Sequence, residues 1–123
     1  VCVPISALAE CVAQTAADMD QAPFPYTIVG HVGDGNFHVL MLLDADSQEE
    51  WDESERLNHR LVERAIAMQG TCTGEHGVGL HKMEFMLAEH GQDALDVMSS
   101  IKQALDPHNI MNPGKMLPPR PLD

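Results

Sequence analysis

The chain has 123 residues, of which 19 are acidic and 7 basic, so its formal net charge is -12 with the histidines neutral. This length and a hydrophobic content of 44% are typical of one soluble globular domain, and the longest strongly apolar run, 39–43, is too short to cross a bilayer. The negative charge argues against nucleic acid as a partner, because phosphate binding needs clustered Lys and Arg. The chain opens with Val1 inside an apolar stretch, which suggests a piece of a longer protein, and its 7 histidines suggest a site.

The first 79 residues predict alternating strands and helices. The Gly-Asp-Gly-Asn run at 33–36 indicates a hairpin between two strands. Ser6 is expected to cap the first helix, Ser47 and Glu50 form a capping box at the start of the second, and Gly70 is expected to end it. The predicted elements are strand 1–5, helix 6–19, strands 26–32 and 37–43, helix 47–68 and strand 71–73. This order predicts an α+β fold with a ferredoxin-like split βαβ sheet.

The remaining residues predict a C-terminal helical segment. Helices are expected over 80–89 and 92–105, and Pro107 follows the second helix, because proline disfavours helix at the residue before it. An irregular tail follows, with a proline-rich stretch at 118–121. We therefore divide the chain into a ferredoxin-like portion that carries the candidate site, residues 1–79, and C-terminal helices with a tail, residues 80–123.

The three cysteines, Cys2, Cys11 and Cys72, are widely spaced and form no C-x-x-C pair. We expect neither a disulfide framework nor a zinc knot from them, and interpret them as free thiols of a reducing compartment. No basic segment followed by an apolar one opens the chain, so the sequence shows no signal peptide.

Two histidines, His31 and His38, flank the predicted hairpin turn. If Asp34 and Gly35 form a two-residue turn, the histidines are directly opposed on one face, with Cβ atoms about 4.5–5.5 Å apart. Imidazoles at that separation can bind one small cation through metal–nitrogen bonds of about 2.0–2.1 Å for zinc. A cross-strand histidine pair at a sheet surface is the alternative.

A second motif, Thr-Gly-Glu-His-Gly-Val-Gly at 73–79, places a carboxylate beside an imidazole in a glycine-rich loop. Glu75 would add an oxygen ligand to the two histidines and leave a coordination position open for substrate. His76 would then act as a general base, because imidazole takes up and releases a proton near neutral pH. The alternative is a glycine-rich loop with a solvent-exposed Glu-His pair.

Three ordered segments together resemble the C-terminal region of FAD-linked 2-hydroxy acid dehydrogenases of the vanillyl-alcohol-oxidase type. They are 31–38 (HVGDGNFH), 70–79 (GTCTGEHGVG) and 105–115, which contains Leu-Asp-Pro and Asn-Pro-Gly-Lys. That family includes D-lactate dehydrogenase (cytochrome), the glycolate oxidase FAD subunit and D-2-hydroxyglutarate dehydrogenase. The resemblance extends across essentially the whole chain, and the residues of 71–77 are most similar to those of the D-lactate branch.

The resemblance implies a ligand set and a base. A divalent cation, zinc or manganese, would be bound by His31, His38 and Glu75. His76 would take the hydroxyl proton of the substrate while the flavin of FAD accepts a hydride. The family's FAD-binding domain and its substrate-binding arginines precede this region and are absent here, so we expect the chain alone to bind no FAD and to be inactive.

The resemblance also bears on substrate and flavin contacts. Family members that act on hydroxyglutarate tend to have a polar residue two positions after the second histidine. Leu40 stands there and favours a smaller or more apolar acid, such as D-lactate oxidised to pyruvate. Asn36 and Asn112 would face the flavin or the substrate, with a turn-forming asparagine as the alternative at both positions.

The expected partners are a small 2-hydroxy acid, the absent FAD-binding domain and an electron acceptor such as a cytochrome or a quinone. A homodimer is one assembly consistent with the sequence, and the expected location is cytoplasmic or peripheral to an energy-transducing membrane, bacterial or mitochondrial. Three other functions stay open: a glycolate oxidase FAD subunit or D-2-hydroxyglutarate dehydrogenase, a stand-alone metal-binding module, and a metal-dependent hydrolase in which His76 acts on a bound water.

Overall fold

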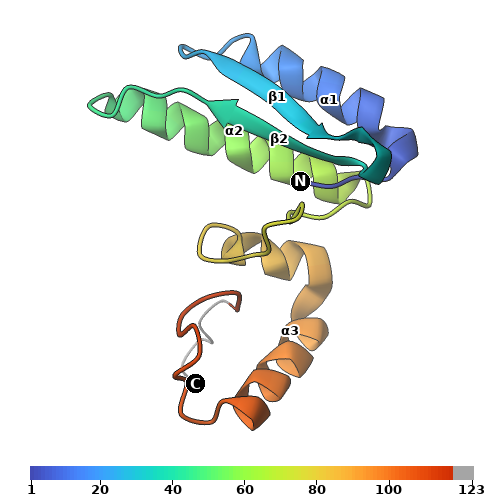
Figure 1. Cartoon of the computed structure of the whole chain (residues 1–123), viewed down its shortest axis with the longest axis vertical. Coiled ribbons are helices and arrows are strands. Elements are labelled where there is room, and N and C mark those ends of the chain that lie inside the picture. Colours follow the sequence, from blue (N-terminus) through green and yellow to red (C-terminus); the bar gives the residue numbers. More distant parts are fainter. Residues whose placement is uncertain (118–123) are drawn as a thin grey trace. The chain divides into compact units, whose positions relative to one another are not determined.

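The computed structural model describes residues 1–117, so the proline-rich stretch predicted at 118–121 lies outside the described residues. The chain separates into two units, Val1–Glu75 and His76–Asp123 (Figure 1). Within residues 1–117, no helix combines the length and apolar character that a membrane span requires.

The first unit is built on a β-hairpin covered by two helices. Its elements are α1 (Ile5–Met19), β1 (Tyr26–His31), β2 (Asn36–Met41) and α2 (Gln48–Ala67). The strands pair antiparallel, and both helices lie on one side of the hairpin (Figure 1). Together with the C-terminal helix α3 (Met86–Leu105), these elements confirm the predicted α+β class.

The predicted outer strands at 1–5 and 71–73 are wrong as strands, because each is reduced to single bridges. Cys2 bridges Asn36 of β2 on one side and Thr71 on the other, both antiparallel. The order Thr71, Cys2, β2, β1 is the one that a split βαβ sheet requires. Pro4 limits the first segment to this length, because it lacks an N–H for a ladder and stands at the N-cap of α1.

The core of the first unit lies between the hairpin and the helices. The buried residues Met19, Phe24 and Leu57 form its centre. Side chains from the inner face of the hairpin pack against them, including Tyr26, Val39 and Met41. The buried face of α2 includes Leu57, Leu61, Val62 and Ala65. The opposite face of the hairpin therefore points away from the helices.

The helix N-termini differ in how well the sequence predicted them. Ser47 is the N-cap of α2, and its Oγ accepts a hydrogen bond of 3.3 Å from the backbone N–H of Glu50, as expected. The Glu50 carboxylate instead accepts from the backbone N–H of Asp44 at 2.7 Å. Ser6 does not cap α1, which begins one residue earlier, at Ile5, without a side-chain cap.

The left-handed residue that follows α2 lies one position before the expected glycine. Gln69 takes the left-handed conformation, with φ of 61°, and the N–H of Gly70 donates to the carbonyl of Ala65 at 2.8 Å. The N–H of Gln69 donates to the carbonyl of Ile66 at 2.9 Å, which completes a Schellman motif. The prediction that Gly70 itself terminates the helix is therefore wrong by one position.

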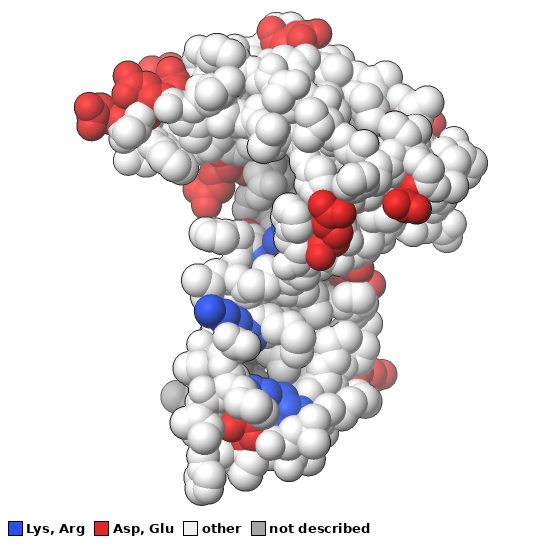
Figure 2. Space-filling view, viewed as in Figure 1, with Lys and Arg blue, Asp and Glu red and all other residues white. Residues whose placement is uncertain are grey.

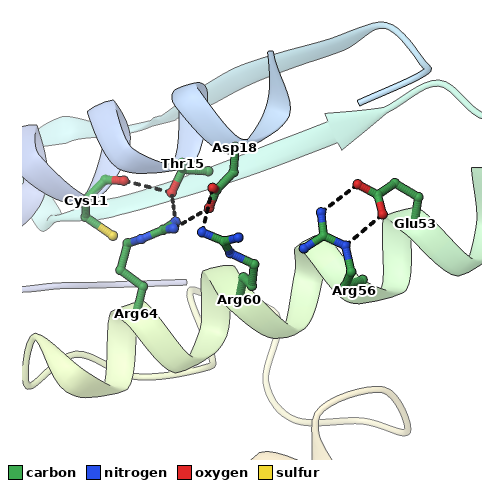
Figure 3. Close-up of polar contacts among 7 residues, drawn as sticks. All are labelled: Cys11, Thr15, Asp18, Glu53, Arg56, Arg60 and Arg64. Carbon is green, nitrogen blue, oxygen red and sulfur yellow. Dashed lines mark hydrogen bonds and ion pairs between the residues drawn. The ribbon is translucent and has the colours of Figure 1, made fainter. Parts of the chain in front are cut away.

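A polar network joins α1 to α2 (Figure 3). The Arg64 guanidinium donates to Thr15 Oγ1 at 2.9 Å and pairs with Asp18, whose other oxygen lies 2.8 Å from Arg60 Nη2. Thr15 in turn donates to the carbonyl of Cys11 at 2.7 Å. Because Arg64 and Asp18 are only 12% and 17% exposed, this pairing is better shielded from water than a surface ion pair.

The cysteines are not disulfide-bonded, as predicted. Cys11 and Cys72 are buried, and burial raises the pKa of the Cys11 thiol, so this thiol stays protonated at neutral pH. Cys2 is only partly buried.

The first helical element of the second unit is a short 3₁₀ turn at Met83–Phe85, which continues into α3, and α3 is kinked at Gly91 (φ 76°, ψ 167°). This kink lies where the sequence separates two helices, whereas 80–82 form a turn instead of helix. Leu95 of α3 is buried, but Val97 and Ile101 are more than half exposed.

Asp106 anchors the segment that follows α3. Its carboxylate pairs with Lys102 and accepts the backbone N–H groups of Ile110 and Met111, at 3.0 and 2.9 Å. Lys102 also donates to the carbonyl of Met111 at 2.6 Å. The hydrogen bond from Lys102 and then those from the two backbone N–H groups hold the pKa of the Asp106 carboxyl below its usual range. An aspartate next to Pro107 at the end of a predicted helix is the sequence signal for such an anchor.

We expect Ser47→Ala to lower the free energy of unfolding by about 1 kcal/mol, because the N–H of Glu50 loses its side-chain acceptor. Urea unfolding followed by circular dichroism measures the change. Ser6→Ala is the matched control, since Ser6 is exposed in the first turn of α1 and α1 has no side-chain cap. Equal losses in the two variants would contradict the assignment of Ser47 as the cap.

We expect Asp106→Asn to destabilise the chain at neutral pH and to reduce the pH dependence of its melting temperature. A carboxyl whose folded pKa is lowered stabilises the fold above its unfolded pKa, and this stabilisation is lost as the pH falls through the folded pKa. Thermal unfolding from neutral to strongly acidic pH tests the prediction, with Asp93→Asn at an exposed position of α3 as the control. An unchanged pH profile in Asp106→Asn would contradict it.

Candidate metal centre

The hairpin loop sets the positions of the two candidate histidines. Val32–Asp34 forms a 3₁₀ turn and Gly35 follows in the left-handed conformation, with φ of 72°. The connection is therefore four residues long, and His31 pairs with Asn36 while His38 pairs with Val29. The prediction that His31 and His38 directly oppose each other across a two-residue turn is wrong, because the 3₁₀ turn adds two residues to the loop.

The corrected register still leaves both histidines on one face. Side chains alternate between faces with a period of two, and the shift from the predicted register is two residues. His31 and His38 are diagonal neighbours, for which Cβ atoms lie about 7–8 Å apart. They project from the hairpin face that the helices leave uncovered, and at this spacing a third group is needed between them.

Glu75 is that third group. Its Oε2 lies 3.5 Å from Nε2 of His31, and its Oε1 lies 3.3 Å from Nε2 of His38. The His38 side chain is 24% exposed, against 62% for His31 and 44% for Glu75. The structure thus brings together the three residues that the sequence predicts as metal ligands, in a site that is open to solvent.

The donor set formed by His31, His38 and Glu75 fits a divalent cation. With bonds of about 2.0–2.2 Å, neighbouring ligand atoms around a tetrahedral zinc lie about 3.3–3.5 Å apart. Each imidazole nitrogen lies at this distance from one of the two oxygens of Glu75, His31 from Oε2 and His38 from Oε1. This spacing is longer than the ~2.7–2.9 Å of a charge-assisted hydrogen bond. Imidazole nitrogen and carboxylate oxygen suit zinc, and a carboxylate also suits manganese.

The charges of the first unit favour a cation over an anion. Residues 1–75 carry 13 of the 19 acidic residues and three of the 7 basic ones. The basic residues Arg56, Arg60 and Arg64 all lie on α2, each paired with Glu53 or Asp18 (Figure 3). Exposed carboxylates gather where α2 begins (Figure 2), and they include Asp44, Asp46, Glu49 and Asp52. The field of this unit attracts cations.

Asn36 lies beside the donor set. It is 5% exposed, and its Nδ2 is 3.5 Å from Nε2 of His38. Among residues 1–117 its Oδ1 has no hydrogen-bond partner. Gly74, which precedes Glu75, packs against this amide so closely that a Cβ at position 74 would lie 2.3 Å from Oδ1.

The other two predicted site residues belong to the second unit. His76 follows Glu75 in the chain, is the first residue of that unit and is exposed. Asn112 is exposed and has φ of 47°, a left-handed conformation that asparagine adopts in turns, which agrees with the turn-forming alternative.

Residues 1–116 match the family model of the FAD linked oxidases, C-terminal domain, and the chain belongs to this family. The family predicted from the three sequence motifs is thereby confirmed.

Named relatives place the chain near D-lactate dehydrogenases. It is 50% identical to the mitochondrial D-lactate dehydrogenase (cytochrome) of Arabidopsis thaliana over 119 residues, which are 97% of this chain and 21% of that protein. It is 49% identical to a probable mitochondrial D-lactate dehydrogenase of Danio rerio over 117 residues, 95% of this chain and 24% of that protein. Glycolate oxidase subunits and a D-2-hydroxyglutarate dehydrogenase are similar at lower identity. The chain therefore spans about a fifth to a quarter of the length of these two D-lactate relatives.

Proposed function

We propose that this chain is the substrate- and metal-binding part of an FAD-dependent D-2-hydroxy acid dehydrogenase that oxidises D-lactate to pyruvate. The observation that carries the proposal is that the Glu75 carboxylate meets both histidines on the uncovered face of the hairpin, at 3.5 Å from Nε2 of His31 and 3.3 Å from Nε2 of His38. The family supports FAD as the redox cofactor, and the names of the relatives support D-lactate.

The metal donors would also position the substrate. A bound divalent cation would polarise the carboxylate and hydroxyl oxygens of a 2-hydroxy acid and ease loss of the hydroxyl proton. His38, the least exposed of the donors, would fix the orientation of the site, while the more exposed His31 and Glu75 border its open side. The arginines of this unit pair with carboxylates on the helix side, so they supply no guanidinium to the substrate.

His76 would act as the general base. A ring nitrogen of His76 would take the proton of the substrate hydroxyl, and FAD, when bound, would supply the hydride-accepting chemistry that completes oxidation to the 2-oxo acid. FAD would be held mainly by residues outside this chain. The position of His76 directly after Glu75 supports its assignment as the base, because it places the imidazole one residue from a proposed metal ligand.

The side chains beside the donors support a small apolar substrate. Leu40 lies on the same strand and face as His38 and is 53% exposed, and Val29, which pairs with His38, is 47% exposed. A methyl group suits this surface better than a second carboxylate does, because an apolar wall offers a carboxylate no hydrogen-bond donors. This contrast favours D-lactate over 2-hydroxyglutarate.

The remaining partners follow from the relatives. The cytochrome in the names of the D-lactate relatives supports a cytochrome as electron acceptor, and their mitochondrial naming supports a mitochondrial location. Asn112 is proposed to contact the flavin or the substrate. A family of FAD-linked oxidases supports redox chemistry over a stand-alone metal store or a hydrolase.

We expect His31→Ala, His38→Ala and Glu75→Gln each to weaken zinc binding by at least ~100-fold, since each removes a direct ligand and loss of a supporting group alone costs about 10–100-fold. Titration of the chain with zinc against a chromogenic chelator measures the affinity. His108→Ala, at an exposed position of the second unit, is the control. A variant that binds zinc as the unchanged chain does would remove its residue from the ligand set.

We expect D-lactate to bleach the flavin of the full-length protein, and His76→Ala to slow this reduction by about 10²–10⁴-fold while metal content stays normal. Stopped-flow absorbance of the flavin and elemental analysis measure the two quantities. The 123-residue chain alone is expected to bind no FAD. Reduction within a few fold of the unchanged protein would refute the base assignment, and bleaching by glycolate or D-2-hydroxyglutarate but not D-lactate would refute the substrate.

A further inference from the structure

Asn36 holds a buried polar group that the proposed mechanism does not use. Its side chain is 5% exposed, and its Oδ1 has no hydrogen-bond partner within residues 1–117. Native structures pair nearly all of their buried polar atoms, so an unpaired amide oxygen inside the first unit needs a physical reason. The surroundings of this amide supply one.

The amide fills the space between two parts of the metal centre. Its Nδ2 lies 3.5 Å from Nε2 of His38, the nitrogen that faces the Glu75 carboxylate. On its other side lies Gly74, where an added Cβ would be 2.3 Å from Oδ1 and 3.2 Å from Cγ of the amide. The Asn36 side chain thus separates the imidazole of one donor from the peptide that precedes another.

The backbone of Asn36 is fixed from both sides. It pairs with His31 across the hairpin, and it forms an isolated bridge with Cys2. These two pairings restrain the strand and, with it, the position of the amide. It is in direct register with His31, in contact with His38 and packed on the residue before Glu75, so all three donors depend on its position.

We propose that Asn36 is a positioning residue of the metal centre, an inference that rests on the proposed function. The amide sets the separation between the His38 imidazole and the Gly74–Glu75 segment, so that Nε2 and the carboxylate meet at the spacing of a coordination shell. The unpaired Oδ1 follows from this role, because the oxygen packs against Gly74 and leaves no space there for a donor. This burial also favours the positioning role over a direct flavin contact by Asn36.

The test is a double-mutant cycle on zinc affinity in the 123-residue chain. Asn36→Ala and Gly74→Ala are each expected to weaken zinc binding about 10–100-fold, the usual effect of losing a group that supports a ligand. The double variant should lose less than the product of the two losses, because removing the amide makes room for the Cβ of residue 74. Asn58→Ala, at a half-buried position of α2, is the matched control and should bind zinc normally.

Thermal unfolding of the metal-free variants separates positioning from a merely structural role. Asn36→Ala should stay folded and unfold cooperatively without metal, although it loses the packing of a buried side chain and the 3.5 Å contact of its Nδ2 with His38. Zinc affinity within twofold of the unchanged chain, or a loss that the control shares, overturns the proposal. If Asn36→Ala does not fold, Asn36→Ser decides by the same criteria. Absence of zinc binding by the unchanged chain would instead refute the donor set of the proposed function.

Discussion

The first unit depends on three residues, Val1 to Val3, whose backbone joins two parts of the chain that are distant in sequence. Val3 donates to the carbonyl of Gly35 at 2.9 Å, and Phe37 donates to the carbonyl of Val1 at 3.1 Å. On the other side, Cys2 and Thr71 exchange hydrogen bonds of 3.2 and 2.8 Å. This segment therefore lies between the strand that carries His38 and the segment that leads to Glu75. Without this segment, no backbone hydrogen bonds would link the strand of His38 to the segment before Glu75, which lies more than 30 residues away in sequence.

Glycines make this close arrangement of backbones feasible. A Cβ at Gly35 would lie 2.0 Å from the carbonyl oxygen of Val3, and one at Gly70 would lie 2.3 Å from that of Cys2. Distances this short exclude any other residue unless the backbone moves. These two glycines, which the sequence predicted as part of a hairpin turn and as a helix end, therefore also let the chain pass close to residues 1–3, and the donors converge as a result.

Features that depend on residues close in sequence were predicted correctly, whereas features that depend on residues distant in sequence were not. The hairpin, its faces and the Ser47 cap depend on residues within a few positions of one another, and the sequence predicted them. The loop length did not follow from its turn residues, because Gly35 is also held by a hydrogen bond from Val3. The face of the two histidines was right although their pairing was wrong, since an error of two residues preserves the alternation. The contact of Asn36 with Gly74 had no local signal at all, because it joins segments 38 residues apart.

The charge of the first unit supports the proposal that a metal anchors an acid substrate. Its three arginines hold α1 to α2 or pair within α2, and most of the acidic residues of the chain belong to this unit. An anionic 2-hydroxy acid would meet a repulsive field at the uncovered face of the hairpin. In the proposed site, two neutral imidazoles and one carboxylate around a divalent cation would carry a net charge of about +1, which would reverse the sign of the field that the proposed substrate meets. The ion pairs of the arginines and the proposed cation site would thus be complementary: the arginines keep the helices packed, and the cation would give the acid a positive centre.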